Sequence, residues 1–310
     1  MAIIETTIST ILATVKTLLE SNKGPGKTLS SIKVIKRGVL PPQNPMPLIA
    51  LIPTEEQVVK KYSSNLVSVN KNFDIFIYNR DYRGKQGVYD LETMVDQTKE
   101  ILVDNYLLPV SGTQKVIDTR IGRTEYGTED TDSSILNVAR LPISCYVREQ
   151  QESPTRRGAI ANNPTGRTLV SEITTFLKNE KSTTLGNKVH VIRDGEVGPE
   201  SKYPAIYVSQ GRASTERRWT GADAIERPIS VDLLSKIQRG ADEELTDHLD
   251  IVENMKTVLE KDPSINSYAW DSEISNIQYG AGVQNNDLVY RSSITMLTTT
   301  RDLTPDHPTI

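Results

Sequence analysis

The 310-residue sequence has little cysteine, few aromatic residues and no long apolar run. Its single cysteine, Cys145, excludes an intramolecular disulfide and a zinc site built from cysteines. Because Cys145 lies in an alternating apolar segment, we expect a buried, unreactive thiol. No stretch approaches the 18 uninterrupted apolar residues of a membrane-spanning helix, and the first residues lack the pattern of a signal peptide. We therefore expect a chain made in the cytosol.

An excess of charge of one sign is also missing. The chain carries 36 Lys and Arg against 40 Asp and Glu, a formal net charge of -4, and the two signs are interspersed. This balance argues against a protein built mainly to coat nucleic acid. Hydrophobic residues make up 36% and aromatic residues 5% of the chain, which favours thin domains with surface that partners cover.

Motifs typical of nucleotide binding, catalysis or metal binding are absent as well. Residues 24–28, Gly-Pro-Gly-Lys-Thr, resemble part of a P-loop, but position 21 is Ser and a helix precedes it, so we expect a helix-ending turn. No Gly-x-Ser-x-Gly marks a serine nucleophile. Metal-ligand spacing is missing among the histidines, which are His190, His248 and His307. The acidic cluster lacks calcium-loop spacing and predicts a solvated hairpin tip, with Glu125, Glu129, Asp130 and Asp132.

What the sequence does contain is a repeat. Residues 32–38 return in similar form as residues 189–195, at an offset of 157. Nine residues after the glycine of each segment a proline opens an apolar run, Pro47 before residues 48–52 and Pro204 before residues 205–208. The repeat predicts one structural unit used twice.

Each copy has the same predicted element order, α-β-β-β-α-β-β. The first has helices at 5–20 and 88–104 and strands at 32–37, 48–52, 66–78, 116–126 and 135–147. The second has helices at 168–179 and 241–260 and strands at 189–193, 205–209, 225–234, 270–279 and 288–297. Offsets fall from 158 to 153, with Phe73 matching Ile229 at 156 and Ile143 matching Met296 at 153.

This order predicts an α+β protein of two similar domains, each a mainly antiparallel sheet flanked by two helices. The predicted boundaries are a first domain at 1–150, a linker at 151–166, a second domain at 167–302 and a C-terminal tail at 303–310. Proline, glycine and arginine give residues 151–166 the composition of a linker.

Polar excursions between strands are the candidate contact surfaces. The segments at 54–65 and 211–222 predict projecting hairpins or arms, and the turns at 128–132 and 283–287 predict polar hairpin tips. The second arm is either a solvated loop, a protein contact or a nucleic-acid contact, since arginine and tryptophan serve both kinds of interface. The predicted contact residues are Lys60, Lys61, Tyr62, Arg212, Arg217, Arg218, Trp219, Glu129, Asp130, Asn285 and Asn286.

The order of elements resembles the tail terminator, or tail completion, proteins of long-tailed bacteriophages. The resemblance rests on the opening helix, the strand ending in Gly38, the strand led by Pro47, the second helix and the closing hairpin, and the same list recurs at 168–297. It covers nearly the whole chain through element order, and single-domain members are near the size of one half.

The resemblance implies a structural virion protein and no enzyme, with no catalytic residue, metal or cofactor. Such a protein forms a ring that caps the tail tube, stops its polymerisation and gives the head or neck a joining surface. Implied partners are copies of the chain (a six-fold ring, or a trimer with pseudo-six-fold symmetry), the tail tube protein, the neck or head-completion protein and, in contractile tails, the sheath protein. DNA passes through the channel without specific binding, and no membrane is involved.

Implied localisation is the head–tail junction of the virion, after assembly in the host cytoplasm. Two alternatives stay open: another neck, sheath-stabilising or tube-capping protein of a contractile tail, and an enzyme or nucleic-acid processing factor on an α+β scaffold.

Overall fold

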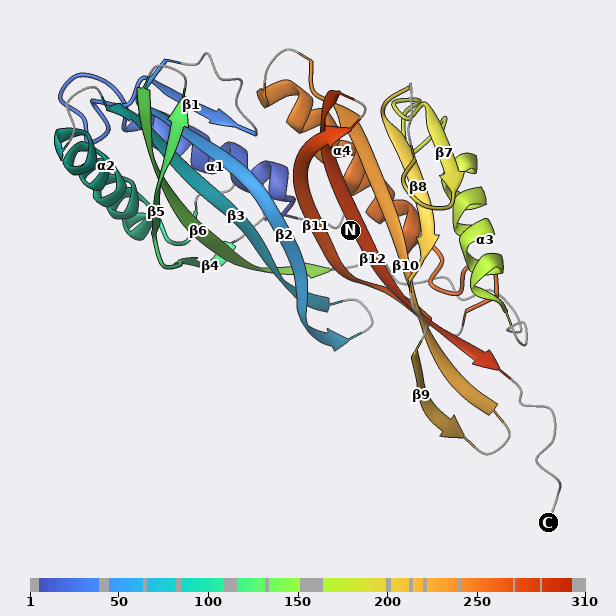
Figure 1. Ribbon diagram of the computed structural model, residues 1–310. Coiled ribbons are helices and arrows are strands. Elements are labelled where there is room, and N and C mark those ends of the chain that lie inside the picture. The colour runs from blue at the N-terminus through green and yellow to red at the C-terminus, as the bar shows by residue number, and fades with distance from the viewer. Residues whose placement is uncertain are drawn as a thin grey trace. The chain divides into compact units, whose positions relative to one another are not determined.

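The structure of the protein, a computed structural model, is α+β, with four helices and mostly antiparallel strands in its described part (Figure 1). It describes residues 6–38, 45–63, 66–81, 85–108, 116–131, 134–150, 164–198, 202–211, 214–219, 222–238, 241–269, 271–284 and 286–302. The predicted fold class is confirmed at this level. The predicted linker up to residue 163 and the C-terminal tail lie outside the described residues.

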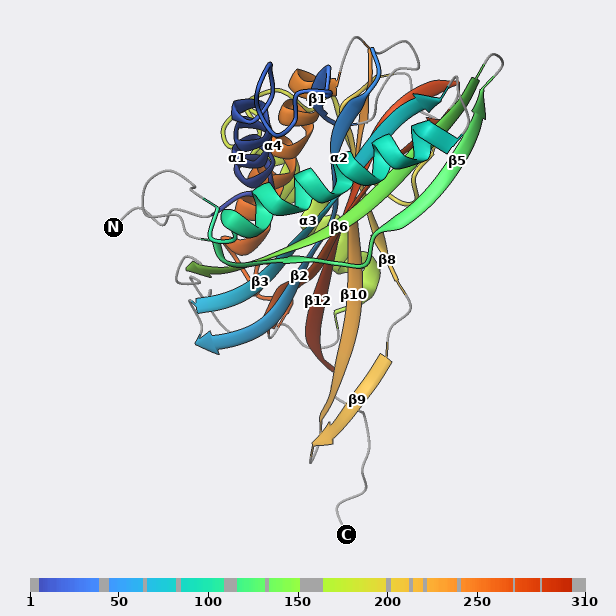
Figure 2. The ribbon, with the colours of Figure 1, turned by 90° about the vertical axis from the view of Figure 1, so that its left-hand side faces the viewer.

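The chain divides into two compact units, and the first comprises residues 1–62, 66–150 and 238–249. Its elements are α1 (Ile8–Ser21), β1 (Val34–Arg37), β2 (Leu48–Ser63), β3 (Leu66–Asp81), α2 (Lys85–Asp104), β4 (Val116–Ile121), β5 (Glu125–Thr131) and β6 (Ser134–Gln150). The strands follow the order β4-β6-β3-β2, with β5 also on β6 and β1 parallel to β2. Helix α2 lies over β3 and β6 (Figure 2).

The second unit comprises residues 63–65, 151–237 and 250–310. Its elements are α3 (Gly166–Asn179), β7 (Val191–Asp194), β8 (Ala205–Gln210), β9 (Ser214–Trp219), β10 (Ala222–Lys236), most of α4 (Ala241–Glu260), β11 (Asp271–Gln284) and β12 (Asp287–Asp302). The strand order is β11-β12-β10-β8-β7, with β9 also on β10 and β7 parallel to β8.

The parallel strand pair has the same register in both units. Val34 of β1 pairs with Leu48 of β2, and Val191 of β7 pairs with Ala205 of β8. Both members of the second pair lie 157 positions after those of the first (191 − 34 and 205 − 48). In each unit the glycine after the short strand donates its N–H at 2.8 Å to the neighbouring strand.

The antiparallel pair at the centre of each unit also matches. Phe73 of β3 faces Ile143 of β6, and Ile229 of β10 faces Met296 of β12. These are the residues that the sequence offsets of 156 and 153 match to one another. Residues that the two offsets match in the sequence therefore pair with each other in the same way in both units.

The first helix of each unit begins in the same way. Helices α1 and α3 each have 14 residues, and their N-caps are Thr7 and Thr165. Each cap hydroxyl accepts a hydrogen bond from the backbone N–H three residues on, at 3.1 Å from Thr10 and 3.2 Å from Thr168. A capping threonine satisfies an amide that the helix itself leaves unpaired.

The two helices of each unit bury apolar side chains against the strands of that unit. In the second unit Leu169 and Ile173 of α3, Val252 and Met255 of α4, and Val231 of β10 belong to one buried core. Helices α2 and α4 bury the same positions at an offset of 157, which the sequence left ambiguous: Leu91 and His248, Met94 and Ile251, Val95 and Val252, Thr98 and Met255, Ile101 and Val258, Leu102 and Leu259.

Several strands extend further than predicted. Strand β2 continues through residues 54–63, and β9 occupies part of 211–222, so each polar excursion is the distal part of a β-hairpin. Residues 128–131 belong to β5, and residues 283, 284 and 287 belong to β11 and β12. The physical reason is shared, because an exposed antiparallel ladder is held by backbone hydrogen bonds and needs no apolar side chains.

Two further differences concern breaks and boundaries. The predicted strand at 116–126 is interrupted after Ile121, where Gly122 donates to Pro142 at 2.7 Å. The first unit also takes residues 238–249. The predicted helix-ending turn is confirmed, since Gly24 and Gly26 follow α1 with φ of 122° and 74°. None of the described helices is both long enough and apolar enough to cross a membrane.

Candidate interaction surfaces

The hairpin of β2 and β3 carries the first predicted arm. Lys60 and Lys61 lie near the end of β2 with exposed side chains, and Val59 beside them is 52% exposed. The backbone of Tyr62 belongs to the same strand, while its side chain lies outside the described residues. The two cations therefore present a basic, partly apolar strand end to solvent.

The hairpin of β9 and β10 carries the second arm. Figure 1 shows β9 and the paired end of β10 extending beyond the part of the second unit that α3 and α4 cover. Arg217, Arg218 and Trp219 are backbone members of β9, opposite Ala224, Asp223 and Ala222 respectively. Their side chains, and the whole of Arg212, lie outside the described residues. The prediction of a projecting hairpin is confirmed for the backbone.

The closing hairpins place the remaining predicted residues. Glu129 and Asp130 pair with Leu136 and Ile135 in the β5–β6 ladder, so they lie along a strand and not at its tip. Asn286 is exposed, with a φ of 65°, in the turn between β11 and β12, where Asn285 lies outside the described residues. A positive φ is one that asparagine tolerates better than most residues.

A groove of about 510 Å³ lies on the sheet face of the second unit opposite its buried core. Residues 278–284 of β11 form one wall, and Val289, Arg291 and Ser293 of β12 line the rest with Leu234 of β10. Arg291 donates to Asp232 at 3.2 Å and its side chain is still 56% exposed. The groove therefore places one exposed cation beside apolar side chains, and no pattern in the sequence predicted it.

The corresponding face of the first unit is also polar. Arg140 bridges Asp74 at 2.8 Å and Glu125 at 3.0 Å. Burial raises the pKa of Asp74, an effect that the hydrogen bond from Arg140 only partly offsets. The Asp–Arg pairs of both units have the same geometry along the strands. Arg140 lies opposite Phe76, two residues after Asp74, and Arg291 lies opposite Leu234, two residues after Asp232.

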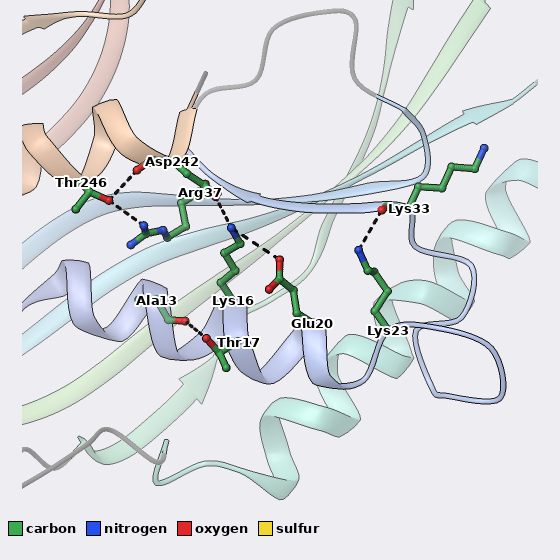
Figure 3. Close-up of polar contacts among 9 residues, drawn as sticks. All are labelled: Ala13, Lys16, Thr17, Glu20, Lys23, Lys33, Arg37, Asp242 and Thr246. Carbon is green, nitrogen blue, oxygen red and sulfur yellow. Dashed lines mark hydrogen bonds and ion pairs between the residues drawn. The ribbon is translucent and has the colours of Figure 1, made fainter. Parts of the chain in front are cut away.

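A set of polar contacts fixes residues 238–249 within the first unit (Figure 3). Asp242, in the first turn of α4, accepts a short bond from the Lys16 ammonium and one of 2.5 Å from the Arg37 backbone N–H. The Arg37 guanidinium donates to the Thr246 hydroxyl at 2.8 Å, and that hydroxyl donates to the Asp242 carbonyl at 2.7 Å. Asp242 therefore ties α4 to both α1 and β1.

Replacing Asp242 with alanine is expected to lower the free energy of unfolding by about 1 kcal/mol, because two charge-assisted contacts at a partly buried site are lost. The matched control is Glu243→Ala, an exposed acid in the same helix turn, where only the interaction with the helix dipole is removed and a few tenths of a kcal/mol are expected. Urea unfolding followed by circular dichroism measures both. Equal effects would contradict the tie.

A buried ionic cluster lies on the core face of the first unit. The Lys71 ammonium of β3 is 2.7 Å from Glu56 of β2 and 2.8 Å from Glu149 of β6. The three side chains are 0%, 3% and 1% exposed. One cation thus pairs with two carboxylates that are buried away from water. Buried charges need such pairing, because burial removes their hydration. Alternation could have revealed this Lys71 cluster, since Lys71 is in phase with the buried residues Phe73, Ile75 and Ile77.

The remaining candidate reactive groups are the cysteine and the three histidines. Cys145 is buried, as predicted, and burial raises the pKa of its thiol to about 12. His190 is exposed, His248 is buried in α4 and His307 lies outside the described residues. Among the described residues, no group of three or more His, Cys, Asp or Glu side chains could hold a metal ion.

Comparison with known proteins adds no candidate residues. A scan against models of protein families and a search of curated proteins both found no match to this chain.

Proposed function

We propose that this chain is a structural virion protein that forms a ring on the end of a phage tail tube, stops tube growth and offers the head or neck a joining surface. The observation that carries the proposal is the equal register of the parallel strand pair in the two units, together with the β2–β3 and β9–β10 hairpins that carry the predicted arms. The order of elements in that unit is the one that resembles tail terminator proteins.

We infer that the two units arose by duplication of one domain. Support comes from three separate features: the shared offset of 157 in the parallel strand pair, the matched central registers and the equivalent threonine caps. The two units differ in where their strands are interrupted. Strand β2 of the first unit is continuous, whereas its counterpart in the second unit is divided into β8 and β9. Strand β11 of the second unit is continuous, whereas its counterpart in the first unit is divided into β4 and β5. Such differences are local, and the strand order is kept.

Duplication gives each chain two similar sets of contact surfaces. Six chains would then form a ring with a second outer ring of domains, and three chains would form a ring with pseudo-six-fold symmetry. In both cases the contacts between neighbours are heterologous, which is the kind of interface that closes into rings. No catalytic group and no cofactor enters this function.

The mass of the purified protein in solution tests the ring. Light scattering should give three or six times the 34.5 kDa of one chain. A mass of one chain at every concentration, down to low ionic strength, would contradict the proposal.

Changing Arg217, Arg218 and Trp219 together to alanine tests the arm. We expect the yield of infectious particles to fall about 100-fold in a complementation assay, because arginine and tryptophan dominate the energy of protein interfaces. The variant should remain folded by circular dichroism, since β9 lies at the end of a hairpin beyond the helix-covered part of its unit. Unjoined heads and tails should accumulate.

The control for the arm removes two exposed cations elsewhere in the same unit, Arg167 and Lys178 of α3. The double alanine variant should give normal yields. Normal yields with the arm variant too would refute the assignment of this hairpin as a contact.

A further inference from the structure

Five strands in the described part of the chain, β1, β4, β5, β7 and β9, pair with one neighbouring strand only and leave their other edge uncovered. Strand β5 pairs only with β6, and β9 pairs only with β10. They have seven and six residues, and neither contains proline or lysine, the residues that commonly protect an edge from pairing. Strands β1 and β7 are shorter, with four residues each, and β4, with six, lies on the same side of β6 as β5 and carries one aspartate and one arginine.

The two edges carry opposite charge. Strand β5 includes Glu125, Glu129 and Asp130, of which Glu125 is already bound by Arg140 at 3.0 Å. Strand β9 includes the neighbouring cations Arg217 and Arg218 with one acid. An acidic edge placed beside a second acidic edge is destabilised by like charges, whereas an acidic edge beside a basic edge is stabilised.

Apolar surface accompanies the acidic edge. Tyr126 of β5 is 53% exposed, and Ile135, which faces Asp130 across the ladder, is 52% exposed. Exposed aromatic and aliphatic groups next to a free strand edge favour the addition of another strand, which supplies backbone hydrogen bonds and covers the side chains.

We propose that β5 of one copy pairs edge to edge with β9 of a second copy, joining the two chains through a continuous β-sheet. A register that sets Glu129 and Asp130 opposite Arg217 and Arg218 brings unlike charges together across the two strands. Each copy then donates one edge and accepts the other, so the contact is head-to-tail. The inference rests on the proposed ring for closure, and head-to-tail contacts close into rings when the rotation between copies permits.

Charge reversal with rescue is the first test. Self-association, measured by sedimentation at low salt, should weaken at least tenfold in Glu129→Lys/Asp130→Lys and equally in Arg217→Glu/Arg218→Glu, because each reversal opposes like charges. The variant carrying all four changes should recover most of the lost affinity. Reversals that leave self-association unchanged would overturn the edge pairing while leaving the ring itself standing.

Engineered cysteines give a second test that preserves charge. Thr128→Cys in β5, an exposed position, and Thr215→Cys in β9 are made in separate proteins. Cys145 does not compete, since it is fully buried. Mild oxidation should produce disulfide-linked dimers in a mixture of the two proteins and not in either one alone.

The other outcomes are equally informative. Dimers formed by Thr128→Cys alone would show a symmetric β5–β5 contact and overturn the inference. A mixture that associates by light scattering but never cross-links, with Ser214→Cys and Glu216→Cys tried in place of Thr215→Cys, would overturn it as well and keep the ring. A wild-type chain that stays monomeric would contradict the ring.

Discussion

Replacing Lys71 with methionine is expected to lower the free energy of unfolding by about 3–5 kcal/mol, because the change strands two carboxylates in the core of the first unit. Glu56 and Glu149 lie 2.7 and 2.8 Å from the ammonium, and both are almost fully buried. Methionine fills a similar volume, so the loss is mainly electrostatic. Urea unfolding followed by circular dichroism measures it.

Two further variants separate charge from packing. In Lys71→Met/Glu56→Gln/Glu149→Gln no charge remains at the site, and most of the lost stability should return, since a buried ion pair replaced as a whole is often close to neutral. Lys33→Met, at an exposed position of the same unit, should change stability by less than about 0.5 kcal/mol. A triple variant no more stable than Lys71→Met would refute the electrostatic explanation.

Acid is expected to destabilise the protein through His248. Burial lowers the pKa of this imidazole from 6.5 to about 3 in the folded chain. As the pH falls below 6.5, His248 takes up a proton in the unfolded chain and stays neutral in the folded chain. The contribution of the neutral imidazole to stability is therefore fully present above pH 6.5 and is lost as the pH falls towards 3. Between pH 6.5 and 4.5 the loss should be roughly 2–3 kcal/mol.

That pH window separates the contribution of His248 from the contribution of Glu180. Hydrogen bonds from Thr183 and Thr184 lower the pKa of Glu180 from 4.5 to about 2, so its contribution is lost only below pH 4.5. His248→Leu should flatten the slope between pH 6.5 and 4.5, whereas His190→Leu, at an exposed position, should leave the slope unchanged. An unchanged slope in His248→Leu would contradict this assignment.

Much of the backbone could be predicted because its signals are local. The apolar stripe of α1 and the acidic first turn of α4 identify those helices, and the predicted limits of α4 agree with the structure to the residue. The repeat added a second source of information, because a strand that is ambiguous in one copy is clear in the other. Two offsets, read independently, match Phe73 to Ile229 and Ile143 to Met296, and the structure pairs the residues within each unit.

Other features depend on contacts between residues far apart in the chain. Residues 54–63 are polar and resemble a loop, although the ladder with β3 keeps them extended as β2. Asp242 contacts Lys16, which lies 226 positions earlier, so no local pattern indicates that residues 238–249 belong to the first unit. The groove beside Arg291 likewise forms only when three strands come together.

The most direct test of the proposed function is immunogold electron microscopy of intact tailed phage particles, which the proposal names as the source of the chain. We expect label confined to the junction of head and tail, in the position of a ring that caps the tube. Label along the outer tail would favour a sheath-stabilising protein, and label at the distal tip would place the protein in a baseplate. Particles that carry no label, even after mild dissociation to expose buried epitopes, would contradict a structural role in the virion.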